Sequence, residues 1–179
     1  MQIGFNKFKK NGVLSSLAAM ALIGVTASPV LAKDPAFFSL GVGSYDWNRQ
    51  KDEGVEIKAE YRHDKKIFGL FKPFAAVSVA KNSSTNYSVG VGILMDVYFG
   101  KRWVLTPSFA PHYYNGGNKK LNLDYALEFR SQVELAYRFD DRSRVGMAVS
   151  HYSNASLGKT NPGTEAATLY YSVPVNFFN

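Results

Sequence analysis

Large apolar side chains alternate with small or polar ones along most of the chain after residue 37, and this alternation constrains the fold more than any other feature. Successive side chains of a β-strand point to opposite faces, so a period of two predicts strands that each have one apolar face. No stretch after residue 37 keeps the period of a helix. The pattern predicts eight strands, at 38–43, 55–62, 75–80, 87–93, 103–110, 123–138, 145–149 and 167–177. We therefore expect an all-β protein.

Polar segments with turn-forming residues separate these strands. Short connections lie at 99–102 and 140–143, and longer ones at 47–54, 82–86 and 115–120. Eight strands joined by alternating short and longer connections are typical of an antiparallel up-and-down barrel. The strand at 103–110 is the least secure of the eight, because Pro107 and Pro111 cannot donate backbone hydrogen bonds to a sheet.

The direction in which the charged faces of two strands point distinguishes a soluble barrel from a membrane barrel. One face of the predicted second strand carries Glu56, Lys58, Glu60 and Arg62, and one face of the sixth carries Glu128, Arg130 and Glu134. In a soluble, lipocalin-like barrel these charges would point into water, whereas in a membrane barrel they would point inward and pair with one another. Small residues opposite the large apolar ones suit a narrow interior, and aromatic residues near strand ends suit membrane interfaces. The pattern favours an eight-stranded antiparallel up-and-down transmembrane β-barrel.

The first 32 residues have the layout of a secretory signal peptide. Three lysines between residues 7 and 10 precede an apolar run at 13–27, and small residues at A-x-A spacing end at Ala32. We expect residues 1–32 to be removed, with Ala27 as a second possible cleavage point, and residues 33–179 to form the barrel domain. A retained anchor is less favoured, because the run is short for a membrane-spanning helix. If both chain ends are periplasmic, the hairpin of the last two strands opens at the outer leaflet.

Cysteine is absent from the chain, which therefore has neither a disulfide framework nor a thiolate metal site. We expect no metal or other cofactor. The formal net charge of +7 includes lysines of the signal segment, and the modestly basic remainder suits an anionic membrane surface. No nucleic-acid partner is expected.

Three residues near the last hairpin have the chemistry of a serine esterase. His151 and Ser153 share the lipid-facing parity of the seventh strand, and Glu165 has that of the eighth. A serine hydroxyl becomes a nucleophile when an imidazole takes its proton, and a carboxylate orients that imidazole. Asn154 is placed to donate to an oxyanion. The alternative is a rim histidine and serine that bind loop backbone beside a solvated carboxylate, and the spacing alone does not separate the two.

The segment HYSNA at 151–155, followed by Glu165, resembles the signature of the PagL lipid A 3-O-deacylases. The resemblance extends to PHYYNG at 111–116, LEFRS at 127–131 and LYYSVP at 169–174. It implies an eight-stranded outer-membrane barrel that removes the 3-linked hydroxyacyl chain of lipid A, and it also suggests a homodimer. By this resemblance Ser153 is the nucleophile, His151 the general base and Glu165 the residue that orients it, with Asn154 in the oxyanion hole.

These observations together predict a lipid A 3-O-deacylase in the outer membrane of a Gram-negative cell, with lipopolysaccharide in the outer leaflet as its substrate. A non-enzymatic small outer-membrane barrel of the OmpA/OmpX type, structural or adhesive, is the main alternative. A soluble periplasmic lipocalin-like binder is the third hypothesis.

Overall fold

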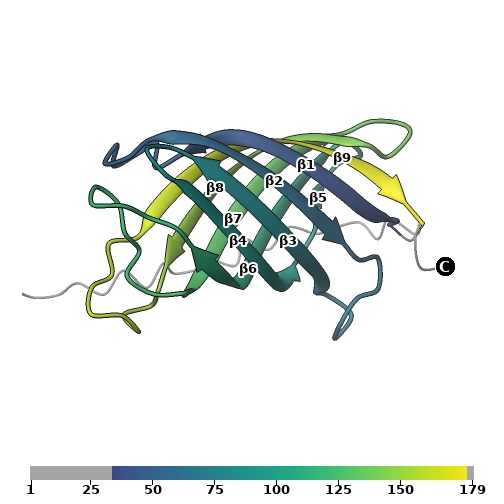
Figure 1. The fold of residues 1–179 in the computed structure, drawn as a ribbon. Helices are drawn as coiled ribbons and strands as arrows, with labels where there is room; N and C mark the ends of the chain where they lie inside the picture. The colour runs from purple at the N-terminus through teal and green to yellow at the C-terminus, as the bar shows by residue number, and fades with distance from the viewer. Residues whose placement is uncertain (1–33, 177–179) are drawn as a thin grey trace, which may run out of the picture.

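A computed structural model describes residues 34–176, which form one closed antiparallel sheet (Figure 1). The strands are β1 (Ala36–Tyr45), β2 (Gly54–Arg62), β3 (Lys72–Lys81), β4 (Thr85–Leu94), β5 (Val97–Phe99), β6 (Trp103–Asn115), β7 (Leu127–Arg138), β8 (Arg144–Ser153) and β9 (Thr164–Val175). Consecutive strands pair from β1 to β4 and from β5 to β9, β9 pairs with β1, and pairing of β4 with β6 closes the ring. The predicted signal peptide and Phe177 lie outside the described residues.

The short strand β5 continues β4 after a break at residues 95–96, and both pair with β6. They are therefore two segments of one interrupted barrel strand. The predicted eight-stranded antiparallel up-and-down barrel is confirmed. No helix long and apolar enough to cross a membrane occurs within residues 34–176.

The outer wall of the barrel is apolar and its interior is charged. On β2, Ile57 is 60% exposed while its neighbour Lys58 is 1% exposed. The same alternation leaves these aliphatic side chains exposed on other strands: Leu40, Val42, Val77, Val79, Val89, Val91, Val133, Leu135, Met147, Val149 and Leu169. Such a continuous apolar band faces hydrocarbon in transmembrane barrels. The soluble lipocalin-like alternative is wrong, because it would expose the charged faces instead.

The inward charges of β2 and β7 form two of the predicted pairs across the barrel, whereas Lys58 pairs with Glu56 of its own strand at 3.1 Å. Arg62 Nη2 lies 2.6 Å from Glu134 Oε2 and 2.9 Å from Glu60 Oε2, and Arg130 Nη1 lies 2.7 Å from Glu60 Oε1. Glu128, expected in the same network, is buried and has no hydrogen-bond partner among the described residues. The small inward residues give this network room. At Gly41, for example, a β-carbon would lie 2.7 Å from the Tyr170 ring.

The strand expected to be weakest is the longest of the nine, since β6 runs unbroken for 13 residues. The Pro107 carbonyl accepts a hydrogen bond from Met95 N, so the backbone of Pro107 faces the break between β4 and β5. Pro111 lies opposite a gap in the β4–β6 pairing, between the Gly90–His112 and Ile93–Phe109 pairs. Both prolines therefore lie at positions where an N–H group would have no partner on the neighbouring strand, so its absence removes no hydrogen bond from the sheet.

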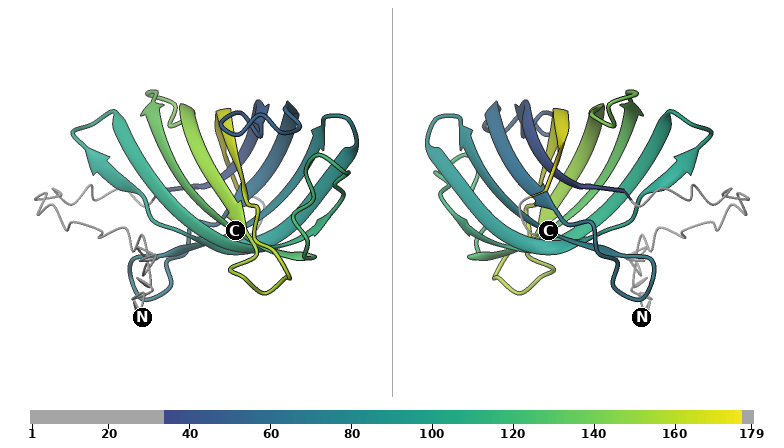
Figure 2. Two further views of the ribbon diagram at one scale, coloured as in Figure 1. Left: turned by 90° about the vertical axis from the view of Figure 1, so that its left-hand side faces the viewer. Right: turned by 90° about the vertical axis from the view of Figure 1, so that its right-hand side faces the viewer.

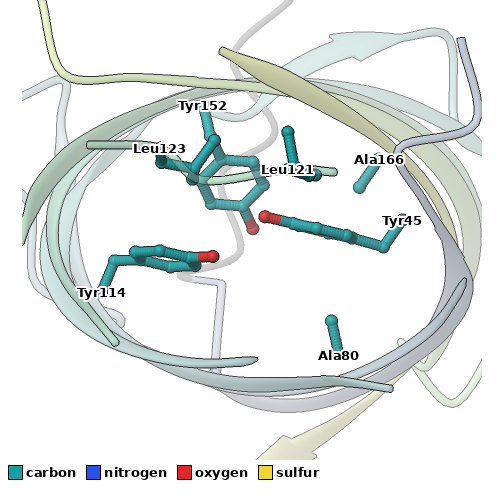
Figure 3. Packing of buried hydrophobic residues seen from close by; sticks show 7 residues of the cluster. All are labelled: Tyr45, Ala80, Tyr114, Leu121, Leu123, Tyr152 and Ala166. Atoms are coloured by element: carbon teal, nitrogen blue, oxygen red, sulfur yellow. The ribbon is translucent and has the colours of Figure 1, made fainter. Parts of the chain in front are cut away.

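The strand predicted at 123–138 begins only at Leu127, because the preceding connection folds back into the mouth of the barrel. Leu123, expected on the lipid-facing wall, is 1% exposed. It packs in a buried cluster with Tyr45, Tyr114, Tyr152 and three smaller side chains (Figure 3). The apolar alternation at residues 121 and 123 therefore reflects two leucines that plug the barrel end.

A single carboxylate links three connections at this end. Asp52, before β2, accepts hydrogen bonds from Ser83 Oγ at 2.5 Å and from the Asn118 side-chain amide. The bond from Ser83, followed by that from Asn118, holds the pKa of Asp52 below its usual value, although desolvation opposes the shift. The β1–β2, β3–β4 and β6–β7 connections are thus tied together.

The chain ends of the barrel meet at the opposite end, where Ala36 pairs with Val175. The connections do not alternate strictly between short and longer ones as predicted. The β2–β3 connection at this end covers residues 63–71, whereas the β3–β4 connection at the mouth covers only 82–84. We call the mouth with the β8–β9 loop the extracellular end and the other the periplasmic end.

Candidate active site

His151 and Glu165 face each other on neighbouring strands at the extracellular end. The β8–β9 register places the two residues directly opposite. His151 Nδ1 lies 3.1 Å from Glu165 Oε1. The His151 side chain is 47% exposed and that of Glu165 is 15% exposed, so the carboxylate is the better shielded of the two. With Nδ1 bonded to the carboxylate, Nε2 is the ring nitrogen left to accept a proton.

Ser153 is the last residue of β8 and lies one outward position beyond His151. It is half-buried and pairs with Phe129 of β7. Within residues 34–176, no hydrogen bond joins its hydroxyl to His151. Bonds between nucleophile and base are often long in ligand-free enzymes and tighten when substrate binds. The structure brings His151 and Glu165 into contact and leaves Ser153 beside them.

All three side chains belong to the outer wall rather than to the interior. Val149 and Met147 continue the outward face of β8 toward the membrane, and both are more than half exposed. A histidine and a carboxylate at the edge of an apolar wall are costly in contact with lipid, so such residues tend to be functional. The position favours chemistry on a membrane lipid.

Asn154, predicted to bind an oxyanion, points inward and is fully buried. Its amide nitrogen donates to the carbonyls of Leu123 at 2.9 Å and Thr160 at 2.8 Å, and its Oδ1 accepts from Ser156 N at 2.9 Å. Both amide hydrogens are therefore engaged. The side chain holds the turn after Ser153, in which Ala155 has a φ of 51° and Ser156 a φ of 65°.

Two residues of the β1–β2 connection that the sequence did not indicate also contact Glu165. Arg49 Nε lies 3.3 Å from Glu165 Oε2, and Arg49 Nη2 lies 3.4 Å from Oε1. Asp46 N donates to the Glu165 carbonyl at 2.7 Å. Neither residue stands in a motif, and Arg49 is 116 positions from Glu165. No local sequence signal could have found these contacts.

An apolar groove lies on the outer wall below the site. It has a volume of about 340 Å³ and is lined by Leu40, Gly41, Val42, Ile57, Val145, Leu169, Tyr170 and Tyr171. Leu169 and Tyr171 lie on the outward face of β9 that also carries Glu165. The groove therefore lies on the same outward face as Glu165, from which Ala167 separates it.

A closed barrel with an apolar outer wall and an outward-facing histidine–carboxylate pair beside a serine defines a small transmembrane barrel with a candidate hydrolase site at its rim. The family model described as Lipid A 3-O-deacylase (PagL) matches residues 36–174. The chain belongs to this family.

A curated relative matches part of the chain. Lipid A deacylase PagL of Pseudomonas aeruginosa is 35% identical over 54 residues, which are 30% of this chain and 31% of that protein. The matched segment thus spans less than a third of this relative's length.

Solved structures share the fold of this chain. The crystal structure of the outer membrane enzyme PagL has a TM-score of 0.58 at 18% identity, with 78% of this chain and 99% of that one covered. Neisserial surface protein A has a TM-score of 0.56 at 8% identity, with 78% and 96% covered. At these identities the likeness establishes the barrel alone, and one barrel can support different functions.

Proposed function

We propose that this protein is an outer-membrane lipid A 3-O-deacylase, a serine esterase that uses Ser153, His151 and Glu165. The observation that carries the proposal is the 3.1 Å contact between His151 and Glu165 on the lipid-facing wall, in a chain of this family. Removal of residues 1–32 is part of the same proposal, so the mature protein should begin at Lys33.

In the proposed reaction, the Ser153 hydroxyl oxygen attacks the carbonyl carbon of the 3-linked hydroxyacyl ester while His151 Nε2 takes its proton. Glu165 stabilises the imidazolium that forms. Collapse of the tetrahedral intermediate breaks the bond to the sugar oxygen, which takes the proton from His151 and leaves as the 3-hydroxyl of lipid A. Water, activated by His151, then attacks the acyl-enzyme and releases the hydroxy fatty acid and free Ser153.

The location of the site supports a lipid substrate. A lipid in the outer leaflet reaches the outer wall directly, without entering the barrel. Its ester groups lie near the membrane surface, at the level of the extracellular rim, while its acyl chains extend along the apolar wall. The 340 Å³ groove offers an acyl chain a hydrophobic path below the site.

Asn154 has an indirect part in this proposal. Because both of its amide hydrogens are bonded to backbone carbonyls, it serves the oxyanion by holding the 154–156 turn beside Ser153. Donation through its own amide would require those two bonds to break.

The homodimer that the family resemblance suggests belongs to the proposal as well, and cross-linking in native membranes would test it.

Replacing Glu165 by Gln is expected to slow release of the hydroxy fatty acid by about 10²- to 10⁴-fold, because the neutral amide no longer stabilises the imidazolium. Mass spectrometry of fatty acid released from purified lipopolysaccharide measures the rate. Glu53→Gln is the matched control, since Glu53 is an exposed carboxylate at the same end that accepts a hydrogen bond from Ser44 Oγ at 3.0 Å. Equal rates for wild type and Glu165→Gln would remove Glu165 from the mechanism.

A non-enzymatic surface barrel is the second candidate function. It is favoured by the lack of a Ser153–His151 hydrogen bond among residues 34–176. This candidate requires that lipid A be the same in cells with and without the protein.

A further inference from the structure

Arg49 contacts the carboxylate that orients the histidine. We propose that Arg49 is a positioning residue of this site, which fixes the rotation of the Glu165 carboxylate and ties it to the β1–β2 connection. The proposal rests on the proposed function, because it assigns Arg49 a role in the same reaction.

The guanidinium contacts both oxygens of the carboxylate. Arg49 Nη2 donates a hydrogen bond to Glu165 Oε1 at 3.4 Å, and Arg49 Nε lies 3.3 Å from Oε2 as an ion pair without a hydrogen bond. The Oε1 atom that accepts from Nη2 is also the one that contacts His151 Nδ1. A planar guanidinium that touches both oxygens limits the rotation of a carboxylate more than a lysine ammonium does. Arg49 thereby sets the direction from which Glu165 meets the imidazole.

The backbone around Glu165 is held by the same connection. Asp46 N donates to the Glu165 carbonyl at 2.7 Å, and Asp46 Oδ1 accepts from Thr164 Oγ1 at 3.0 Å. Arg49 Nη1 also donates to the Pro162 carbonyl. Two extracellular connections, 46–53 and 154–163, therefore converge on one carboxylate.

At Gly163 the backbone passes close to the side chains of both His151 and Arg49. The glycine has a φ of +60°, and a β-carbon there would lie 3.1 Å from His151 Cε1 and 3.6 Å from Arg49 Nη2. This tight passage leaves Arg49, Glu165 and His151 little freedom to move independently.

The test compares Arg49→Gln, Arg49→Lys and Arg49→Ala in the full barrel with purified lipopolysaccharide as substrate. We expect Arg49→Gln to lower kcat by about 10- to 100-fold with KM within about threefold, because misorientation costs rate rather than binding. Arg49→Lys should recover only part of the loss, and added guanidinium ion should partly restore Arg49→Ala. Arg102→Gln is the matched control, since Arg102 makes an ion pair with exposed Asp140 at the periplasmic end.

Ser153→Ala measured in parallel separates two kinds of failure. Loss of activity in Ser153→Ala with full activity in Arg49→Gln overturns only the role of Arg49. Full activity in both variants overturns the proposed function and this inference with it. A rise in KM at unchanged kcat also overturns the inference, because Arg49 would then bind substrate directly. Heat-dependent electrophoretic migration reports whether each variant is a folded barrel.

A separate feature at the periplasmic end is a small hairpin in the β2–β3 connection. Ile67 N donates to Phe71 O at 2.6 Å and Phe71 N to Ile67 O at 3.1 Å. Phe68 and Gly69 between them have φ values of 51° and 70°. Leu70 N also donates to Ile67 O at 3.2 Å, and positive φ at both central residues is typical of such a tight hairpin turn. The segment is therefore an ordered hairpin.

The tip of this hairpin is apolar and exposed. Phe68 is 94% exposed, Leu70 47% and Ile67 42%. Two exposed lysines, Lys65 and Lys66, precede it. Figures 1 and 2 show the β2–β3 connection reaching beyond the outline of the barrel wall. The β7–β8 turn at the same end of the barrel differs, because its tip at 140–143 carries only charged and hydroxyl side chains.

We infer that the 65–71 hairpin inserts into the phospholipid leaflet on the periplasmic side, with Phe68 among the acyl chains and the lysines at the phosphates. Aromatic residues flanked by basic ones are typical of membrane interfaces, and lysines near an anionic surface add attraction. The hairpin also continues from the lipid-facing wall of the same barrel. This inference is independent of the proposed function.

Because the chain has no cysteine, a cysteine introduced by substitution is labelled at that one position. Phe68→Cys is labelled with an environment-sensitive fluorophore, and the barrel is reconstituted in vesicles of phosphatidylethanolamine and phosphatidylglycerol. We expect blue-shifted emission that spin-labelled lipid quenches. The matched control, Asp141→Cys in the β7–β8 turn, should emit as in water and resist quenching. Water-like emission from both positions would overturn the inference and favour a soluble periplasmic partner.

Discussion

Ser153→Ala is expected to reduce hydroxy fatty acid release from purified lipopolysaccharide by about 10⁶-fold, which is below detection, while the barrel stays folded. Loss of the nucleophile in a serine hydrolase costs about that much because the residues of a triad act as a unit. Ser153 is half-buried at the end of β8 and the structure gives it no core packing role, so its removal leaves the sheet intact. Mass spectrometry of the released acid measures the loss.

A second outward-facing serine provides a matched control for this variant. Ser131 of β7 is exposed and lies directly opposite His151 in the β7–β8 register. Ser131→Ala should retain wild-type activity, since the proposed nucleophile is Ser153. The reverse result, with Ser131→Ala inactive and Ser153→Ala active, would mean that His151 serves the other hydroxyl.

Arg62→Met is expected to lower the free energy of unfolding of the barrel by about 3–5 kcal/mol. Arg62 contacts both Glu60 and Glu134 inside the barrel, and all three side chains are almost fully buried. Its loss leaves Glu134 as a buried charge without this partner, whereas Glu60 keeps Arg130. Denaturant unfolding of the protein in vesicles, followed by fluorescence, measures the change.

Two further variants show whether the effect comes from burial. Arg62→Met combined with Glu134→Leu should recover much of the loss, because a buried ion pair can be replaced by apolar side chains at little cost. Arg102→Met should change the stability by less than about 1 kcal/mol, because its pair with Asp140 is exposed. Equal losses in Arg62→Met and Arg102→Met would contradict a stabilising interior network.

The barrel and the direction of its faces could be predicted because both follow from a period of two. From Val55 to Arg62 each outward residue on β2 is apolar and each inward one is charged, so a single strand already indicates which face meets lipid. That charges of β2 and β7 would pair across the narrow interior could be predicted, but not that the pairs would be Arg62 with Glu134 and Arg130 with Glu60. The His151–Glu165 contact could also be expected, since adjacent antiparallel strands share a hairpin.

Features that depend on connections could not be predicted from the same pattern. Leu123 alternates like a strand residue, yet its connection folds back and buries it inside the mouth. Pro107 and Pro111 suggested a broken strand, but the interruption falls on β4 and β5 instead. Arg49 reaches Glu165 across 116 positions, and Asn154 is held by carbonyls of two separate loops. Such contacts depend on loop conformations that strand periodicity does not constrain.

The central claim is that this protein removes the 3-linked hydroxyacyl chain of lipid A through Ser153. The most direct measurement is mass spectrometry of lipid A from Gram-negative cells that lack the protein, express it, or express Ser153→Ala. Loss of one hydroxyacyl chain is expected only in cells with the wild-type protein. Identical lipid A in all three, or deacylation by Ser153→Ala, would contradict it.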